Sequence, residues 1–298
     1  MVRTTPERPV DLTALFPGLA EYARTATRLH PRAGAPTVRD SSVGGPLLWP
    51  AGEPWPRCPD THEAHDGWTV ALAQLYVRDI PGLSGPPGTD LLQVLWCPFD
   101  HGEGPAVTLR WRLASAVDLV LDDPPQPAAI GCPEYLPEPC VLHPEQITEF
   151  PRAVQLFEEL DPDLCEQIAA WSRRADGISP EDSEAEVPWE DAGRYDAISA
   201  TATWKTGGWP FWSFRDPWPI HCAACDATMA PLLQVGSGEW FDDLDYWTPV
   251  EDLADIHAGS LAPGTHGNPP QISLAHGYRL QIYVCPDSAD HPHQQVLV

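Results

Sequence analysis

The chain has 298 residues, 43% of them apolar, and its 17 basic and 43 acidic residues give a formal net charge of −26. Such a surface repels phosphate backbones, because nucleic-acid affinity comes largely from cations that neutralise phosphates, so we exclude DNA and RNA as partners. No apolar run approaches the roughly 20 residues of a membrane span, and the N-terminal residues lack the apolar core of a signal peptide.

Residues 1–41 are expected to form an N-terminal helix and a connector. Asp11 can cap a helix that runs toward Leu29 with apolar residues on one face, although Pro17 inside that range favours a break. Residues 30–41 are predicted to be the connector. The 36 prolines of the chain argue against long helices and favour turns and short strands.

Residues 42–150 are predicted to be a first β unit with a Pro-rich extension. Apolar and alternating runs predict strands at 70–77, 91–97, 106–114 and 117–121. The extension, from residue 123 to 150, has no regular pattern.

Residues 151–198 are predicted to hold a helix and an acidic linker. Asp161 is suited to cap the helix, Pro162 to begin it and Gly177 to follow its end. The linker at 179–194 is acidic and poor in apolar residues.

Residues 199–298 are predicted to be a second β unit. Strands are expected at 199–206, 232–235 and 278–285, with a short edge strand over 294–298. A long insertion, at about 236–277, separates the second and third of these strands.

The two β units share an ordered set of motifs. Each contains a Gly-Gly pair, a Trp-Pro, a cysteine, two strands interrupted by glutamine, and a closing Cys-Pro. Gly45 to Trp55 is ten residues, as is Gly208 to Trp218, and four residues separate glutamine from cysteine in the second strand of both units. This agreement predicts an internal duplication and a mainly β (α+β) fold of two tandem related antiparallel units with a few flanking helices.

The eight cysteines are better suited to metal binding than to disulfides. Without a signal peptide the protein is predicted to be cytoplasmic, where thiols stay reduced. Reduced cysteines in this number favour metal ligands or buried thiols.

The second unit contains the pattern expected of a structural zinc site. Zinc takes thiolate and imidazole ligands in tetrahedral geometry, and a Cys-x2-Cys pair on a turn supplies two of them. We predict a site formed by Cys222, Cys225 and Cys285 with either His291 or His293. His221 is a lesser candidate for the fourth ligand, and buried thiols with solvent-facing histidines are the alternative.

The first unit offers a second set of ligands at matching positions, and we predict that it could hold a second zinc ion. The set consists of Cys58, His62, Cys97 and His101, with His65 as a substitute for His62. Elsewhere, Cys132, Cys140 and His143 lack a fourth partner, and Cys165 is expected to be a core residue.

The sequence predicts no catalytic centre. It contains neither the H-E-x-x-H pattern nor the deaminase zinc pattern, and it has no G-x-S-x-G, P-loop or G-x-G-x-x-G motif. The chain is therefore expected to be non-catalytic. A zinc-dependent hydrolase with an open metal position is kept as an alternative.

An acidic-aromatic patch in the insertion is the predicted protein-binding surface. Aromatic residues anchor protein interfaces and acidic residues steer basic partners. The patch comprises Trp240, Phe241, Asp242, Asp243, Tyr246 and Trp247. The tryptophans that follow the Gly-Gly pairs are expected to be core or turn residues, and any that are exposed would extend the surface; they are Trp49, Trp55, Trp209, Trp212 and Trp218.

The order of these motifs resembles the YwqG-like family of uncharacterised bacterial proteins. The second unit, with its Cys222-x2-Cys225 pair, is also similar to the N-terminal region of the eukaryotic programmed-cell-death-2 proteins. The resemblance covers about residues 42–121 and 199–298, and it implies two related, mainly antiparallel β units.

For function, the resemblance implies binding of another protein. The eukaryotic relatives are chaperones of a basic ribosomal protein, and some bacterial relatives are encoded beside secreted toxins. We therefore expect a non-catalytic, zinc-stabilised module that binds a basic client protein. An immunity protein that neutralises a toxin is the alternative.

Overall fold

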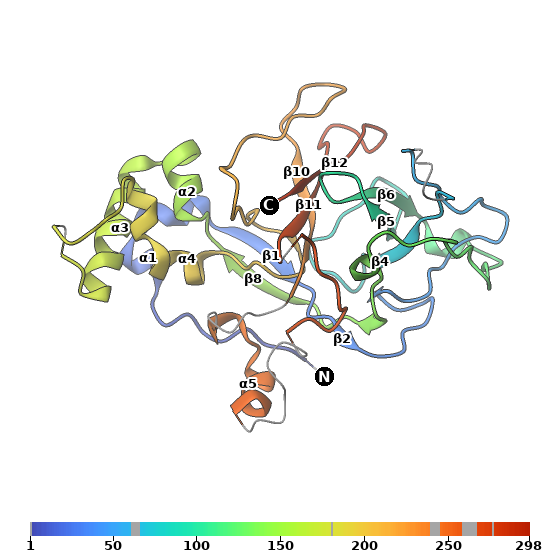
Figure 1. Ribbon diagram of the computed structural model, residues 1–298, viewed down its shortest axis with the longest axis horizontal. Coiled ribbons are helices and arrows are strands. Elements are labelled where there is room, and N and C mark those ends of the chain that lie inside the picture. Colours follow the sequence, from blue (N-terminus) through green and yellow to red (C-terminus); the bar gives the residue numbers. More distant parts are fainter. Residues whose placement is uncertain (1, 61–65, 180, 239–244, 258–266, 276) are drawn as a thin grey trace.

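The fold is built on two six-stranded antiparallel sheets. The computed structural model describes residues 2–60, 66–179, 181–238, 245–257, 267–275 and 277–298 (Figure 1). In spatial order, sheet A consists of β12 (Gln294–Leu297), β11 (Arg279–Val284), β10 (Ala230–Gly236), β9 (Lys205–Gly207), β1 (Arg24–Arg28) and β8 (Glu145–Glu149). Sheet B consists of β2 (Arg32–Ala33), β7 (Cys140–Val141), β3 (Ser42–Val43), β4 (Val70–Tyr76), β5 (Leu91–Asp100) and β6 (Pro105–Arg112).

The helices gather mainly at one end of the molecule, at the left in Figure 1. They are α1 (Leu12–Leu15), α2 (Ala153–Gln155), α3 (Pro162–Asp176) and α4 (Gly193–Ser199), with α5 (Val250–His257) lying apart. Short 3₁₀ segments lie at Pro17–Tyr22, Ala114–Ala116, Pro133–Tyr135, Pro188–Asp191 and Asp245–Trp247, and a π-helical turn at Leu156–Leu160. This arrangement confirms the predicted mainly β class with flanking helices. Among the described residues, no helix is both long and apolar enough to cross a lipid bilayer.

The two sheets have the same strand order. Strands β3, β4, β5 and β6 are neighbours in sheet B in the same order as β9, β10, β11 and β12 in sheet A. In each sheet two further strands lie next to the first strand of this set, which is β3 or β9. The six strands of sheet B all lie within residues 32–141, whereas sheet A takes β1 from before this stretch and β8 to β12 from after it. Sheet A therefore draws strands from both sides of sheet B in the sequence, and its strand β8 lies before residue 150, within the range predicted for the first β unit.

The registers of the two sheets also match. Gln74 pairs with Gln93 as Gln234 pairs with Gln281, and both ladders have an irregularity just before the first of these glutamines. Gly44 lies directly after β3, and Gly207 is the last residue of β9. Both have left-handed backbone, with φ of 62° and 65°. Matching registers and turns are what an internal duplication would leave, and that origin stays a prediction.

The main core lies between the sheets and receives residues from both. It contains Leu72, Leu92, Val94 and Trp96 of sheet B and Val235, Leu280 and Ile282 of sheet A. A second core, under the helices, includes Leu164 and Ile168 of α3.

The predicted α3 is confirmed, with its caps. Asp161 accepts a hydrogen bond from the Leu164 N–H, Pro162 begins the helix, and Gly177 ends it in left-handed conformation. Strands β4, β5, β6, β10, β11 and β12 lie where the sequence predicts them.

Four segments differ from the predictions. The strand predicted over 199–206 is limited to β9, because α4 runs to Ser199, and the extension at 123–150, predicted to be irregular, contains β7 and β8. Asp11 caps α1, but this helix ends at Leu15 and residues 24–28 form strand β1 instead of continuing a helix. Strand pairing with β8 and β9, far away in the sequence, overrides the helical periodicity of this segment. Residues 117–121 make only an isolated bridge, between Val120 and Pro50.

One ion pair is fully buried in sheet A. The ammonium group of Lys205 donates to both carboxylate oxygens of Glu149, at 2.8 and 2.7 Å, and to the Trp209 carbonyl oxygen. The carboxylate also accepts from the N–H groups of Thr201 and Trp209. Gly208 is required beside it, because a Cβ there would lie 2.3 Å from a Glu149 oxygen.

Side chains of β12 cover the free edge of β6 where the two sheets meet. The Gln295 amide accepts from the Val107 N–H at 2.9 Å and donates to the Pro105 carbonyl oxygen at 2.7 Å. The His293 ring lies 3.1 Å from the Val107 carbonyl oxygen. These contacts satisfy an edge that would otherwise be open to another strand.

Candidate metal centre

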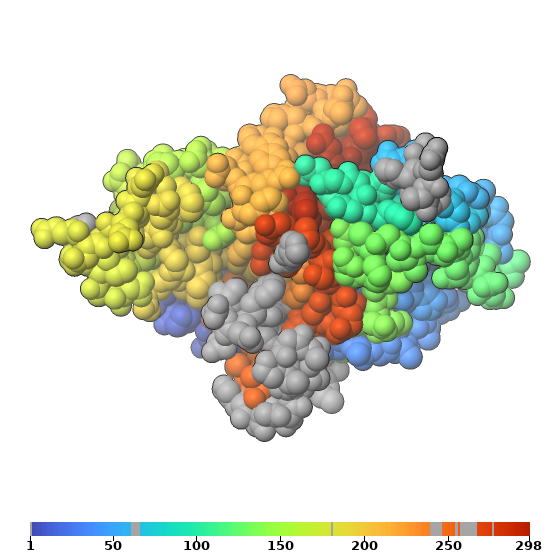
Figure 2. All heavy atoms as spheres, in the orientation of Figure 1, coloured from blue at the N-terminus to red at the C-terminus, as the bar shows by residue number. Residues whose placement is uncertain are grey.

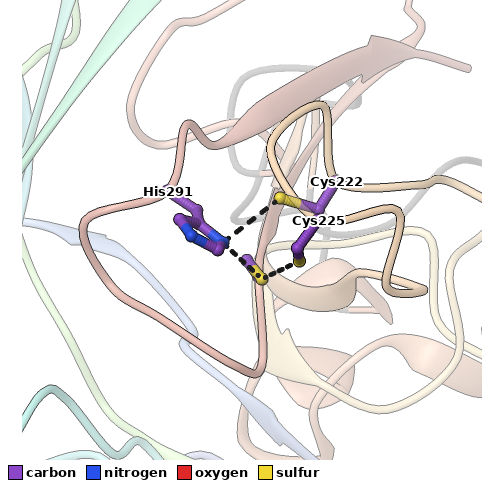
Figure 3. A group of neighbouring side chains, drawn as sticks. Cys222, Cys225 and His291 are labelled. Carbon is purple, nitrogen blue, oxygen red and sulfur yellow. Dashed lines mark hydrogen bonds between the residues drawn. The ribbon is translucent and has the colours of Figure 1, made fainter.

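Four predicted ligands of the second unit come together from two segments. Cys222 and Cys225 lie on the turn before β10, Cys285 directly follows β11, and His291 lies in the loop between β11 and β12. One ligand atom from each lies within 4.8 Å of the others. Figure 3 shows the His291 ring directed toward the Cys222 and Cys225 side.

The separations of these atoms fit a single tetrahedral ion. The His291 Nδ1 atom is 3.6 Å from the Cys222 sulfur and 3.3 Å from the Cys285 sulfur, and the Cys225 and Cys285 sulfurs are 3.5 Å apart. Zinc bonds of about 2.3 Å to sulfur and about 2.0 Å to nitrogen place tetrahedral ligand atoms roughly 3.5–3.8 Å apart. The cluster therefore has dimensions suited to zinc.

The turn that carries the two paired cysteines is held by its own backbone. The Cys222 N–H donates to the Ala227 carbonyl oxygen at 2.9 Å, and the Asp226 N–H donates to the Cys222 carbonyl oxygen at 2.8 Å. The Ala224 N–H points at the Cys222 sulfur at 3.4 Å. Asp226 closes the turn with φ of 62°, a conformation that Asp adopts more readily than most residues.

The surroundings of Cys285 favour its thiolate. Burial raises the pKa of this thiol, but hydrogen bonds from His291 and from the N–H groups of Asp287 and Ser288 outweigh it and lower the pKa to about 6. A thiol that ionises readily is a ready metal ligand.

The other histidines near this cluster have different contacts. His293, the alternative fourth ligand, is directed to the Val107 carbonyl oxygen, and the structure brings His291 to the cysteines instead. His221 is exposed, and its ring is 3.0 Å from the Asp226 carbonyl oxygen. Of these two histidines, only His291 faces the cysteines.

The first unit brings together Cys58, Cys97 and His101. One ligand atom from each lies within 4.8 Å of the others, and the His101 Nε2 atom is 3.5 Å from the Cys58 sulfur. The predicted ligand His62, with its substitute His65, lies outside the described residues. Burial, and after it the neighbouring Cys58, raises the pKa of the Cys97 thiol to about 12.

Asp60 orients His101 in this cluster. A carboxylate oxygen of Asp60 is 3.2 Å from the His101 Nδ1 atom, so the opposite ring nitrogen is left to face Cys58. Metal-bound histidines are commonly held in this way by a carboxylate. Asp60 is not among the residues predicted from the sequence. Its position two residues after Cys58 is a signal from which this role could have been predicted.

The third group of the sequence does not gather into a ligand set among the described residues. Cys140 is buried in sheet B beside β3 and belongs to the main core, and Cys132 packs against it. Burial, with Arg3 and Arg32 nearby, lowers the pKa of His143 to about 4. Cys165 is a core residue under the helices, as predicted.

The predicted protein-binding patch is corrected at Trp247. This side chain is only 2% exposed, its indole N–H donates to the Ala197 carbonyl oxygen at 2.8 Å, and its ring stacks edge-on with Tyr246. It is a packing residue because its ring and its polar atom are both occupied. Trp240, Phe241, Asp242 and Asp243 lie outside the described residues.

Four of the five tryptophans after the Gly-Gly pairs are buried, as expected, and Trp218 is exposed. The four glutamines that interrupt the strands are buried as well. The Gln74 amide, for example, accepts from the Leu48 N–H at 2.7 Å, and the matching Gln234 amide accepts from the Phe211 N–H at 3.2 Å.

Two comparisons with known proteins were without a match. No protein-family model matches this chain, and no curated protein matches it.

Proposed function

We propose that this protein is a non-catalytic, zinc-stabilised module that binds another protein, with zinc held by Cys222, Cys225, Cys285 and His291. The observation that carries the zinc proposal is the convergence of these four ligand atoms within 4.8 Å of one another. Three thiolates and an imidazole form a ligand set that binds zinc. Magnesium and calcium take oxygen ligands instead.

The centre is proposed to be structural. Four protein ligands fill a tetrahedral coordination, which leaves no position for a water or substrate. An ion there would tie the turn before β10 to the loop after β11, because two ligands lie on each of these segments. Free energy of metal binding would then add to the free energy of folding.

The partner is proposed to be a basic protein in the cytoplasm. A net charge of −26 attracts and steers cationic partners over long range. The resemblance to the YwqG-like and programmed-cell-death-2 families supports the same proposal, because a chaperone of a basic client needs such a surface. A reducing compartment would keep the thiols free to bind metal.

Elemental analysis of protein purified without chelator tests the zinc proposal. We expect at least one zinc per chain, and Cys222→Ser should lose one. His293→Ala is the matched control and should retain it, since His293 contacts Val107 instead. Protein that contains no zinc, or a Cys222→Ser variant that keeps all of it, would refute the proposal.

The same measurement on Cys58→Ser tests the first unit. Zinc near two per chain, with one lost in each cysteine variant, would mean that both units hold an ion. Zinc near one per chain that Cys58→Ser retains would restrict the metal to the second unit.

A further inference from the structure

A pair of tryptophans occupies the same place in both halves of the molecule. Trp49 and Trp55 have ring centroids 5.1 Å apart at 52°, and Trp212 and Trp218 have centroids 4.7 Å apart at 54°. Each pair follows its Gly-Gly by the same number of residues. The two pairs therefore allow a direct comparison of what covers them.

In the first half the pair is covered by the protein itself. Trp55 is only 8% exposed, and its indole N–H donates to the Thr69 carbonyl oxygen at 2.8 Å. Leu121 and Trp68 pack against the pair. The backbone N–H of Leu121 donates a hydrogen bond to the Trp49 carbonyl oxygen at 2.8 Å.

In the second half the outer tryptophan is open. Trp218 is 39% exposed, and it is the only exposed tryptophan in the described part of the chain. Beside it in the sequence, Phe214 is 42% exposed and stacks on Tyr278 with centroids 4.0 Å apart. No described backbone segment is bonded to residues 212–214 as the Leu121 segment is bonded to Trp49.

Exposed carboxylates accompany this aromatic surface. Asp216 lies between the two aromatic residues, and Asp226 lies on the turn of the metal centre. Asp287 and Asp290 lie in the loop that holds His291, and a carboxylate oxygen of Asp287 is 3.8 Å from the Cys225 sulfur. The cation Arg215 is already paired with Glu103, at 2.9 Å.

These segments lie together on one side of the molecule. The chain around residues 210–230 and the loop after β11 are side by side at the top of Figure 2, coloured orange and red. Trp212, Cys222 and Cys285 share one buried cluster, so the aromatic surface rests directly on the metal centre. We call Phe214, Trp218, Asp216, Asp226, Asp287 and Asp290 the Trp218 surface.

We infer that the Trp218 surface binds an arginine- and lysine-rich segment of a partner protein that also places an apolar side chain on Trp218. This inference rests on the proposed protein-binding function and names its surface. The apolar side chain would take the place that Leu121 takes in the first half. Cations of the same segment would lie over the aromatic faces and beside the carboxylates, both of which attract them.

A short synthetic peptide of arginine, lysine and leucine, labelled with fluorescein, is the probe for the first experiment. Its Kd is measured by fluorescence anisotropy at physiological salt, where attraction between distant charges is screened. We expect Trp218→Ala to weaken binding about tenfold, as truncation of an aromatic anchor does. Leu119→Ala is the control, because Leu119 is more exposed than Trp218 but lies in the first half.

A charge-matched pair of variants separates a site from diffuse attraction. Asp216→Asn with Asp226→Asn removes two charges from the Trp218 surface, and Asp122→Asn with Asp123→Asn removes two exposed charges from the first half. Asparagine tolerates the backbone conformation of Asp226. We expect the first variant to weaken binding at least about fivefold more than the second.

Equal weakening by the two double variants, equal weakening by the two alanine variants, or no binding of the peptide would overturn the inference. Zinc content is measured on every variant. A wild-type protein without zinc would refute the proposed metal centre whatever the peptide does, whereas unchanged zinc with unselective binding would refute the Trp218 surface alone.

Discussion

At the residue scale, the buried ion pair of Lys205 and Glu149 makes a large difference to stability if one partner is lost. Removing one partner of a buried ion pair leaves a charge without compensation. Burial lowers the pKa of Lys205, and Glu149 opposes that shift by favouring the charged ammonium. The buried pair is stabilised because each of its charged atoms has a hydrogen-bond partner in or beside sheet A.

We expect Lys205→Met to destabilise the protein by about 3–5 kcal/mol, because Glu149 would stay buried without a cation. The free energy of unfolding is measured by urea titration. Arg194→Met is the control, since Arg194 and Asp176 form an ion pair that is largely exposed and should contribute less than about 1 kcal/mol. Similar losses in the two variants would contradict the assignment of a structural role to the buried pair.

The sequence predicts which side chains gather into the candidate metal centre better than it predicts exposure. Cys222, Cys225 and Cys285 were identified from spacing, because a Cys-x2-Cys turn and a strand end are local features. Spacing could not distinguish His291 from His293, because the path of the loop before β12 decides which ring faces the cysteines. Trp55 and Trp218 have the same motif around them, and only the tertiary cover on Trp55 makes their exposures differ.

At the element scale, the edge of β6 depends on a side chain of β12. Gln295 supplies both a donor and an acceptor to this edge, at Pro105 and Val107. It acts like one residue of an additional strand, and it joins the edge of sheet B to sheet A.

We expect Gln295→Ala to cost about 1–3 kcal/mol, because two backbone groups lose their partner. Amide hydrogen exchange at Val107 should become faster, since its N–H would no longer be bonded. Gln294→Ala is the control: the neighbouring side chain is directed to the His221 carbonyl oxygen and does not contact β6. Unchanged exchange at Val107 would show that Gln295 does not protect the edge.

Local signals predicted elements only where local interactions decide them. Helix α3 has both caps and an apolar face in its own sequence, so it was predicted with nearly correct ends. Strand β1 was predicted as helix, because its partners β8 and β9 lie more than a hundred residues away and leave no local trace. Residues 117–121 have strand-like composition, but only Val120 finds a bridge partner.

At the scale of the whole molecule, the chain leaves sheet A after β1 and returns to it at β8, so all of sheet B lies between two strands of sheet A in the sequence. Sheet A is incomplete without β1, and sheet B is incomplete without β7. The main core adds to this, because both sheets contribute side chains to it. The predicted duplication implies two similar units, but it could not predict that sheet A would take β1 and β8 from the part of the chain before residue 150.

We therefore expect that fragments 1–127 and 128–298 will not fold alone and will form a folded complex when mixed. Circular dichroism during thermal unfolding and size-exclusion chromatography measure this. Fragment 1–182 is the control, because it contains every strand of sheet B. Cooperative unfolding of either fragment by itself would show that its sheet does not need the strand that the fragment lacks, β7 in 1–127 and β1 in 128–298.

The burial of Lys205 gives the protein a chemical reporter of its own opening. It is the only lysine in the chain, and in the folded state its amine is enclosed beside Glu149. Reagents that acylate lysine side chains, and enzymes that attach modifiers to them, therefore find no target until sheet A separates. The rate at which a lysine-directed reagent labels Lys205 therefore reports how often sheet A separates.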